Sequence, residues 1–383
     1  MLVFLIAAAL CGFAGALALG WLFPLPAAVH AHLALAIGAL PLIMGAMLHF
    51  APVLTRSGAP AAPLRLLPWL AQSGGVIVTL AFVFPVFLVV GRNLAALLAL
   101  VAAVSLAVWM WRRGRQALGK PHPGLNWYLA ALVCLVFALA SVLAMSAWPE
   151  HYLAWKRLHL HLNLIGLIGL TAIGTVQVLL PTAVGKPDAQ VAGRLRSDLK
   201  YAFAATLLIA AGAAGFPWLG WAGLALWSFP LHRLLAAWLK RYRNEIFNRH
   251  GATPSLAVAP FGFALSLLFG ALQGSGAMQG SGVILTGGVA HVFVFAFLLP
   301  LVTGAASQLL PIWLRPGAQT PWHGEMRRKL GRWGGIRALL FLGGGIAVAV
   351  GWRVGIASAA LGLALFIAQL LAALTNSARI QVK

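Results

Sequence analysis

Three apolar segments of this chain carry histidines at matching places near their start. They read HAHLALAIGALPLIMGAMLHFAP, HLHLNLIGLIGLTAIGTVQVLLP and VAHVFVFAFLLPLVTGAASQLLP, and their histidines are His30, His32, His159, His161 and His291. An imidazole within a bilayer is costly to bury unless it has a partner. Neutral imidazole is a common ligand of haem iron and of copper. We therefore take these five histidines as candidate ligands of a haem or a metal ion.

In both histidine pairs, a single residue separates the two members. Residues two apart on a helix point about 200° away from each other, so His159 and His161 face different neighbours and do not chelate one ion together. The same holds for His30 and His32. A structural role, in which the histidines only hydrogen-bond across helices, is the alternative. Because the histidines share one depth on related segments, we favour ligands, with a metal site that involves His159 and His161.

The three segments align without gaps, which indicates an internal repeat. The matched positions are His32, His161 and His291; Gly45, Gly174 and Gly304; and Pro52, Pro181 and Pro311. Internal repeats with functional groups at their interfaces are common in membrane proteins. We expect a single membrane domain over residues 1–383, with three four-helix units near residues 1–125, 126–254 and 255–383 in pseudo-threefold symmetry.

The composition places the chain among membrane proteins. Of its 383 residues, 62% are hydrophobic and only 8% are charged, which is typical of membrane proteins and not of soluble globular chains. Counting apolar runs of about 17–25 residues, the length that crosses a bilayer, predicts an all-α integral membrane protein with twelve transmembrane helices. The predicted spans are 2–23, 29–54, 68–90, 94–111, 126–148, 158–183, 200–217, 219–239, 255–273, 283–313, 336–352 and 354–375.

The basic residues predict how these helices are oriented. The formal net charge is +22, but the basic residues lie in short runs between apolar segments, which argues against a nucleic-acid partner. Of the 27 Lys and Arg, only Arg92, Lys156, Arg157 and Arg353 fall on the side opposite to both termini. Cytoplasmic loops are the ones rich in Lys and Arg. We expect a multi-pass protein of the bacterial inner membrane, surrounded by the lipid bilayer, with both termini cytoplasmic.

In this orientation the histidines enter the membrane near its outer face. The matched glycines and prolines follow about 20 and 30 Å deeper at 1.5 Å per residue, so the candidate sites belong to the outer half. Small residues on the second segment, Gly166, Gly169 and Gly174, would let a neighbouring backbone or a flat cofactor approach closely.

The acidic residues argue against proton pumping. All five are predicted to lie in loops, and they are Glu150, Asp188, Asp198, Glu245 and Glu325. Proton pumps and proton-driven transporters usually need buried carboxylates as relays. We therefore expect no spanning helix to carry a carboxylate.

With twelve helices, a threefold arrangement and histidines on helices 2, 6 and 10, the chain resembles subunit I of the haem–copper oxidase superfamily. The likeness is closest to the cbb3-type and nitric oxide reductase branch and to NnrS-like membrane proteins. The resemblance covers the whole chain in topology and is specific in motif over three helices. It implies that His291, with Gly304 and Pro311 at the family's spacing, is a ligand of a low-spin b-type haem, and that helix 2 supplies the opposite ligand.

The symmetry of the repeat leaves the second haem ligand open. A haem wedged between two helices needs opposite faces, which favours His30 over His32 as the partner of His291. By the same argument His32 could pair with His159, while His161 would face Val289. Both histidines of helix 2 stay candidates.

The chain also departs from the oxidase pattern. The predicted helix 7 lacks the histidine pair that holds copper in the oxidases, and Val289 stands where they carry the high-spin haem ligand. The acidic residue expected after the His-x-His of NnrS-like proteins is Leu33 here. These differences argue against a complete oxygen-reducing centre.

We therefore expect a haem-binding membrane protein, with copper as a second candidate cofactor, in redox or gas-ligand chemistry of nitric oxide or copper metabolism. Its partners would be an electron-donor protein or a small gas ligand, and an additional subunit. The alternative is a non-enzymatic transporter or assembly factor on the same scaffold.

Overall fold

The computed structural model describes residues 1–23, 25–274 and 288–381, and these residues form helices joined by short turns, without a strand. The chain divides into two compact units, residues 1–175 with 189–227 and residues 176–188 with 228–383. Among the described residues, nine helical segments are long and apolar enough to cross a membrane. The all-helical, multi-pass membrane class expected from the composition is therefore confirmed.

Nine of the twelve predicted spans correspond to these segments. The nine segments are Leu2–Leu19, Ala27–Thr55, Ala62–Val83, Pro85–Arg115, Gly124–Ala147, Pro149–Val184, Thr253–Gly274, Gly288–Leu314 and Val354–Thr375. The predicted spans 200–217, 219–239 and 336–352 fall on three further helices, α9 (Val191–Ala214), α10 (Pro217–Ile246) and α15 (Gly334–Ala349). Residues 283–287 of the tenth predicted span lie outside the described residues.

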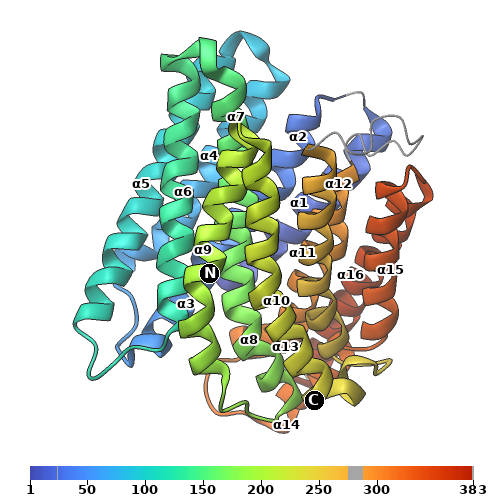
Figure 1. Cartoon of the computed structure of the whole chain (residues 1–383). Helices are drawn as coiled ribbons and strands as arrows, with labels where there is room; N and C mark the ends of the chain where they lie inside the picture. Colours follow the sequence, from blue (N-terminus) through green and yellow to red (C-terminus); the bar gives the residue numbers. More distant parts are fainter. Residues whose placement is uncertain (24, 275–287, 382–383) are drawn as a thin grey trace. The chain divides into compact units, whose positions relative to one another are not determined.

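The first unit is a set of long helices with short connections (Figure 1). Its elements are α1 (Leu2–Leu22), α2 (Ala27–His32), a π-helical segment (Leu33–Ala39), α3 (Leu40–Thr55), α4 (Leu67–Val83), α5 (Leu88–Arg115), α6 (Gly124–Ala147), α7 (Tyr152–His161), a second π-helical segment (Leu162–Leu170), the start of α8 (Thr171–Val184), α9 and the start of α10. Helices α4 and α5 pack as a hairpin, and α5 packs in turn on α6.

The turn of that hairpin differs from the prediction. We expected the break at residues 91–93, but the structure places it at Phe84–Phe87, because Pro85 forces the preceding residue out of the helical region. Arg92 therefore lies inside α5, where its guanidinium donates to Ser146 Oγ of α6 at 2.5 Å. It is a helix residue and not the loop residue that was predicted.

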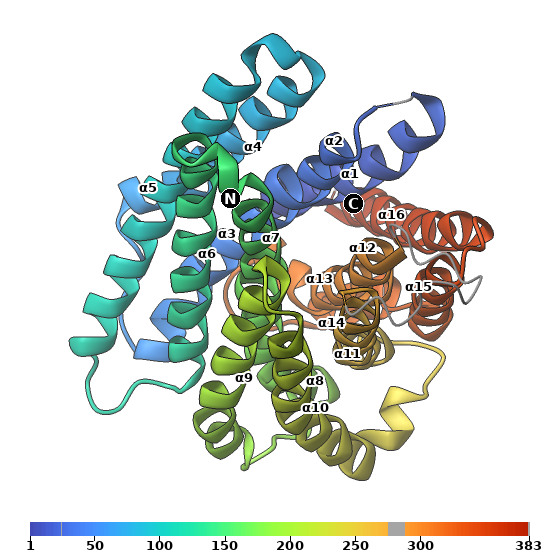
Figure 2. The same ribbon diagram turned by 45° about the horizontal axis from the view of Figure 1, so that its top comes forward.

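The second unit contains the end of α8 and of α10 followed by the last helices of the chain. These are α11 (Thr253–Gly274), α12 (Gly288–Val292), a third π-helical segment (Phe293–Leu298), α13 (Leu299–Leu314), α14 (Pro321–Leu330), α15 and α16 (Val354–Gln381). Helices α15 and α16 lie side by side (Figure 2), and α11 packs on the π-helical segment and on α13.

Each of the three histidine-bearing helices changes from α to π and back to α. The π-helical segment begins directly after His32 and His161, and one residue beyond His291. Such wide turns are rare and occur often at functional sites. The three helices thus share the same change of helix type at matching positions of the sequence alignment.

The matched glycines also make corresponding contacts. A Cβ on Gly45 would meet the Leu5 side chain of α1 at 2.5 Å, and one on Gly174 would meet Trp127 of α6 at 2.8 Å. On Gly304 it would lie 3.1 Å from Leu256 of α11. In each case the neighbour belongs to the first helix of the predicted repeat. The glycine lets the first two helices of each predicted repeat approach closely.

The prediction that all five acidic residues lie in loops is wrong for three of them, because Asp198 lies in α9, Glu245 near the end of α10 and Glu325 in α14. Asp198 lies within α9 because the helix begins at Val191, well before the predicted span. Its side chain is fully buried. Ser197 Oγ donates to Asp198 Oδ1 at 2.8 Å, and the buried Arg194 precedes it by one helical turn. A cation and an anion at this spacing lie on the same face of a helix.

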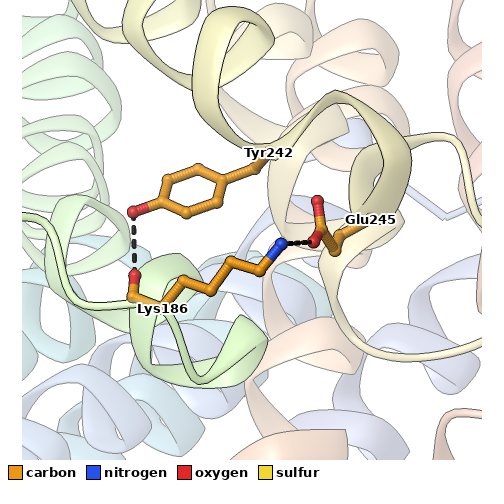
Figure 3. A network of polar contacts seen from close by, with 3 residues as sticks. All are labelled: Lys186, Tyr242 and Glu245. Atoms are coloured by element: carbon orange, nitrogen blue, oxygen red, sulfur yellow. Dashed lines mark hydrogen bonds and ion pairs between the residues drawn. The ribbon is translucent and has the colours of Figure 1, made fainter.

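In the second unit, a polar network holds the turn after α8 against the end of α10. Tyr242 donates its hydroxyl to the backbone oxygen of Lys186 at 2.9 Å, and the Lys186 ammonium pairs with Glu245 (Figure 3). The hydrogen bond from Lys186 lowers the pKa of Glu245. Arg241 pairs with Asp188 beside it. Two of the five acidic residues thus fasten this turn.

We predict that Gly262→Ala destabilises the second unit. A Cβ at this position of α11 would lie 2.0 Å from the backbone oxygen of Ala296 in the third π-helical segment. Overpacking of this kind costs roughly 1–3 kcal/mol, so the midpoint of thermal unfolding in detergent should fall.

The matched control for this prediction is Gly343→Ala on α15, where a Cβ would meet nothing within 4 Å. It should leave the midpoint unchanged or raise it slightly, because alanine favours a helix over glycine. Equal losses in the two variants would contradict the proposed close contact.

Candidate metal centre

Four of the five candidate histidines belong to the first unit. His30 and His32 lie in the last turn of α2, and His159 and His161 lie in the last turn of α7. All four are half-buried. Because both stretches are α-helical, the members of each pair point to different sides of their helix, as the spacing predicts.

Two repeat-matched histidines make the same hydrogen bond. His32 Nδ1 lies 2.7 Å from the backbone oxygen of Ala28, and His161 Nδ1 lies 2.8 Å from that of Arg157. In both, the acceptor is four residues earlier in the helix. A carbonyl oxygen only accepts, so Nδ1 must carry the proton. In a neutral ring, Nε2 then keeps its lone pair.

His159 reaches the same state through a different helix. Its Nδ1 lies 3.0 Å from the backbone oxygen of Ala138 on α6. Asn163, one turn later, donates its amide to the backbone oxygen of His159 at 2.8 Å and lies 3.3 Å from Nδ1. The Ala138 carbonyl decides the tautomer, because it cannot donate. Nε2 of His159 is therefore also the basic nitrogen.

His32 and His159 lie in the same unit and interact electrostatically. The His32 ring also packs on Phe82 of α4, with the ring centroids 5.0 Å apart. The symmetry of the repeat raised this pairing as one of two options for His32. Both rings are oriented through Nδ1 and present Nε2, so they form a pair of matched nitrogen donors.

The two remaining histidines differ from this pair. His30 has a buried Nδ1 without a hydrogen-bond partner, so its orientation is not fixed in the same way. His291 lies in α12 of the second unit, half-buried, with its ring edge-on to Phe295 at 5.3 Å. The expectation that His291 shares a haem with a histidine of helix 2 stays a prediction.

The donor set fits a group that takes two imidazoles. Among the described residues, no cluster of three or more His, Cys, Asp or Glu side chains is arranged to hold a metal ion. A metal ligand histidine usually donates its other ring nitrogen to a carbonyl or carboxylate, which fixes the tautomer and raises basicity. His32 and His159 meet that requirement. Two such nitrogens could hold a haem iron or a copper ion.

The glycines of the predicted span 158–183 do not add to this site. A Cβ on Gly166 would meet Cys134 of α6 at 2.5 Å, and Gly174 meets Trp127 of the same helix. Of the two options that the sequence left open, close helix packing is therefore the one that applies to these two glycines. The space beside them is filled by α6 and not left for a flat cofactor.

Sequence reasoning missed the groups that orient the rings. Asn163 had a detectable signal, because it follows His159 by four residues and so shares its helix face. Phe82 and the Ala138 carbonyl had none, since their helices lie far from the histidines in the chain.

Comparison with known proteins adds no assignment. No protein-family model matches this chain, and no curated protein matches it either.

We predict that His32, His159 and His161 carry their proton on Nδ1 in the metal-free protein. Nitrogen-15 NMR of histidine-labelled protein at neutral pH distinguishes the two tautomers, and single His→Asn variants assign the signals. The matched control is His122, whose Nδ1 accepts the N–H of Gly124 at 3.2 Å, which leaves the proton on Nε2. Burial, followed by the charge of Arg196, lowers the pKa of His122, so its ring is neutral in this measurement.

An Nε2-protonated signal for His32 or His159 would contradict the geometry, because the ring would then present no basic nitrogen to a metal.

Proposed function

We propose that this chain is a haem-binding membrane protein related to subunit I of the haem–copper oxidases, with His32 and His159 as the ligand pair of a b-type haem. His30, His161 and His291 are the further candidate ligands, and copper is the candidate for the site at His161. The role would be redox or gas-ligand chemistry without proton pumping.

The observation that supports this proposal most is the shared tautomer. A histidine with only a structural role can donate from either ring nitrogen, so such a role does not require the same tautomer at both positions. Here both His32 and His159 donate Nδ1–H to a backbone carbonyl, and the two rings interact electrostatically. Nε2 of each ring therefore keeps a lone pair that no hydrogen bond uses in this arrangement. Iron and copper are metals that such nitrogens bind.

The protein residues would prepare the ligands and restrict water. Ala28 and Ala138 carbonyls hold the imidazoles in one orientation, and Asn163 ties the end of α7. Phe82 covers one side of the His32 ring. A haem iron with two imidazole ligands supplies one-electron transfer. Because they are held in one orientation, His32 and His159 would stay in place when the iron changes its oxidation state.

The buried Asp198 does not change the proposal against pumping. It lies one turn after the buried Arg194, at the spacing where opposite charges offset each other.

We further propose that all twelve helices cross the bacterial inner membrane, in three repeats of four, with both termini cytoplasmic and the histidines toward the outer face. The three π-helical segments and the three matched glycines support the repeat. The i−4 hydrogen bond that His32 and His161 share supports it as well. The distribution of Lys and Arg supports the orientation.

The test is the visible spectrum of protein purified from haem-sufficient cells. The wild type should show sharp α and β bands on reduction. His32→Ala and His159→Ala should each abolish or strongly reduce these bands, because either loses an axial nitrogen. His232→Ala, at an exposed position of α10, is the control and should keep them.

A colourless wild-type preparation would overturn the haem proposal. Metal analysis of the same samples tests copper, which His161→Ala should lower while the haem bands remain. A colourless protein that holds copper would favour the transporter or assembly-factor role.

A further inference from the structure

Positively charged side chains surround one tryptophan of the second unit, in the turn between α14 and α15. Arg249 and Arg332 both lie over the ring of Trp333, with the guanidinium carbons 4.0 and 5.6 Å from its centroid. The His250 ring lies 5.3 Å from the same ring. Arg249, His250 and Arg332 are exposed, and Trp333 is half-buried. We call these four residues the Trp333 surface.

The backbone fixes this arrangement before any ligand is present. The loop before α11 and the turn before α15 are joined by two hydrogen bonds, from Gly251 N to Gly331 O at 2.7 Å and from Gly335 N to Arg249 O at 3.0 Å. A Cβ on Gly334 would lie 2.0 Å from the Gly251 oxygen, so only glycine allows this approach. A surface that is already ordered loses less entropy when it binds.

Trp333 itself holds an unusual conformation. Its φ is 59°, in the left-handed region that bulky residues rarely adopt. Its backbone N–H donates to His250 Nδ1 at 3.1 Å, which leaves the His250 proton on Nε2 in the neutral ring. Strained backbone of this kind persists where the surroundings demand it and is common at binding sites. His250 thus offers an N–H donor beside two guanidinium groups.

Among the described residues, the positive charges of the Trp333 surface have no acidic partner. In the part of the chain that the structure describes, no carboxylate pairs with Arg249 or Arg332, while Lys186, Arg241 and Lys329 do have acidic partners. Two like charges over one ring repel each other, and a bound anion between them would remove that repulsion. Guanidinium groups match the oxygens of a phosphate well.

Apolar groups continue directly from this basic surface. Ile336 and Leu339, in the first turns of α15, are 36% and 68% exposed, and Phe247 before the loop is 72% exposed. Tryptophan and basic residues next to an exposed apolar helix face are typical of the membrane interface on the cytoplasmic side. The neighbourhood therefore fits a molecule with a phosphate head and acyl chains better than a soluble phosphate.

We propose that the Trp333 surface binds the headgroup phosphate of an anionic phospholipid. Arg249 and Arg332 pair with the phosphate oxygens, and His250 Nε2–H donates to one of them. The acyl chains lie along the exposed face of α15. This binding is independent of the proposed haem site, which belongs to the first unit.

The experiment titrates the full-length protein in a neutral detergent with phosphatidylglycerol, with phosphatidylcholine of the same acyl chains, and with inorganic phosphate. Native mass spectrometry gives the apparent Kd of lipid adducts, and the thermal unfolding midpoint gives stabilisation. The wild type should bind phosphatidylglycerol more tightly than phosphatidylcholine. The double variant Arg249→Gln, Arg332→Gln should bind phosphatidylglycerol about tenfold or more weakly, because each arginine near an anionic surface contributes substantially.

The matched control is Arg113→Gln with Arg115→Gln on α5. These arginines also stack on tryptophans, at 5.7 and 5.2 Å, but each has its own ring, Trp109 or Trp111. The control should keep the lipid affinity and the wild-type unfolding midpoint without lipid. Equal weakening in both double variants, or no headgroup preference, would overturn the proposal. Full stabilisation by inorganic phosphate alone would assign the surface to a soluble anion instead.

Discussion

The candidate site depends on one constraint, which is that a bilayer offers no hydrogen-bond partner to a buried polar group. Each imidazole N–H in an apolar segment must therefore find an acceptor within the chain. His32 and His161 find it one turn back in their own helix, and His159 finds it on α6. Satisfying Nδ1 in this way leaves Nε2 as a basic nitrogen. The hydrogen bonds that satisfy Nδ1 of these histidines thus also leave each of them a nitrogen that could bind a metal.

Neighbouring helices also pack closely on the π-helical segments. Gln72 donates to the Ile37 oxygen at 3.2 Å, and Gly75 brings α4 so near that a Cβ would lie 2.6 Å from the Ala36 oxygen. In the second unit Gly262 does the same at Ala296. The first and third wide turns are therefore packed closely by the backbone of a neighbouring helix, and all three wide turns follow a candidate ligand in the sequence.

Charge is arranged differently at the two candidate sites. The recorded neighbours of His32 and His159 are uncharged, namely Phe82, Asn163 and backbone carbonyls, so an iron or copper ion there would meet basic nitrogen. The Trp333 surface instead has excess positive charge, because the acidic residues of the second unit pair with Lys186, Arg241 and Lys329. The first arrangement suits a cationic centre inside the membrane. The second suits an anion at its edge.

Local pattern was sufficient for the membrane class, for most of the helices and for the alignment of His32, His161 and His291, since hydropathy and spacing are properties of neighbouring residues. It misplaced the α4–α5 turn, because Pro85 breaks the helix before the more polar residues at 91–93. It also put Asp198 in a loop, because the first residues of α9 are polar and do not look like part of a membrane span. It left open whether Gly166 and Gly174 face a cofactor or a helix. Only the tertiary structure decided that they face α6 and that Ala138 orients His159. These contacts join segments far apart in the chain, and no local preference specifies which helix packs against which.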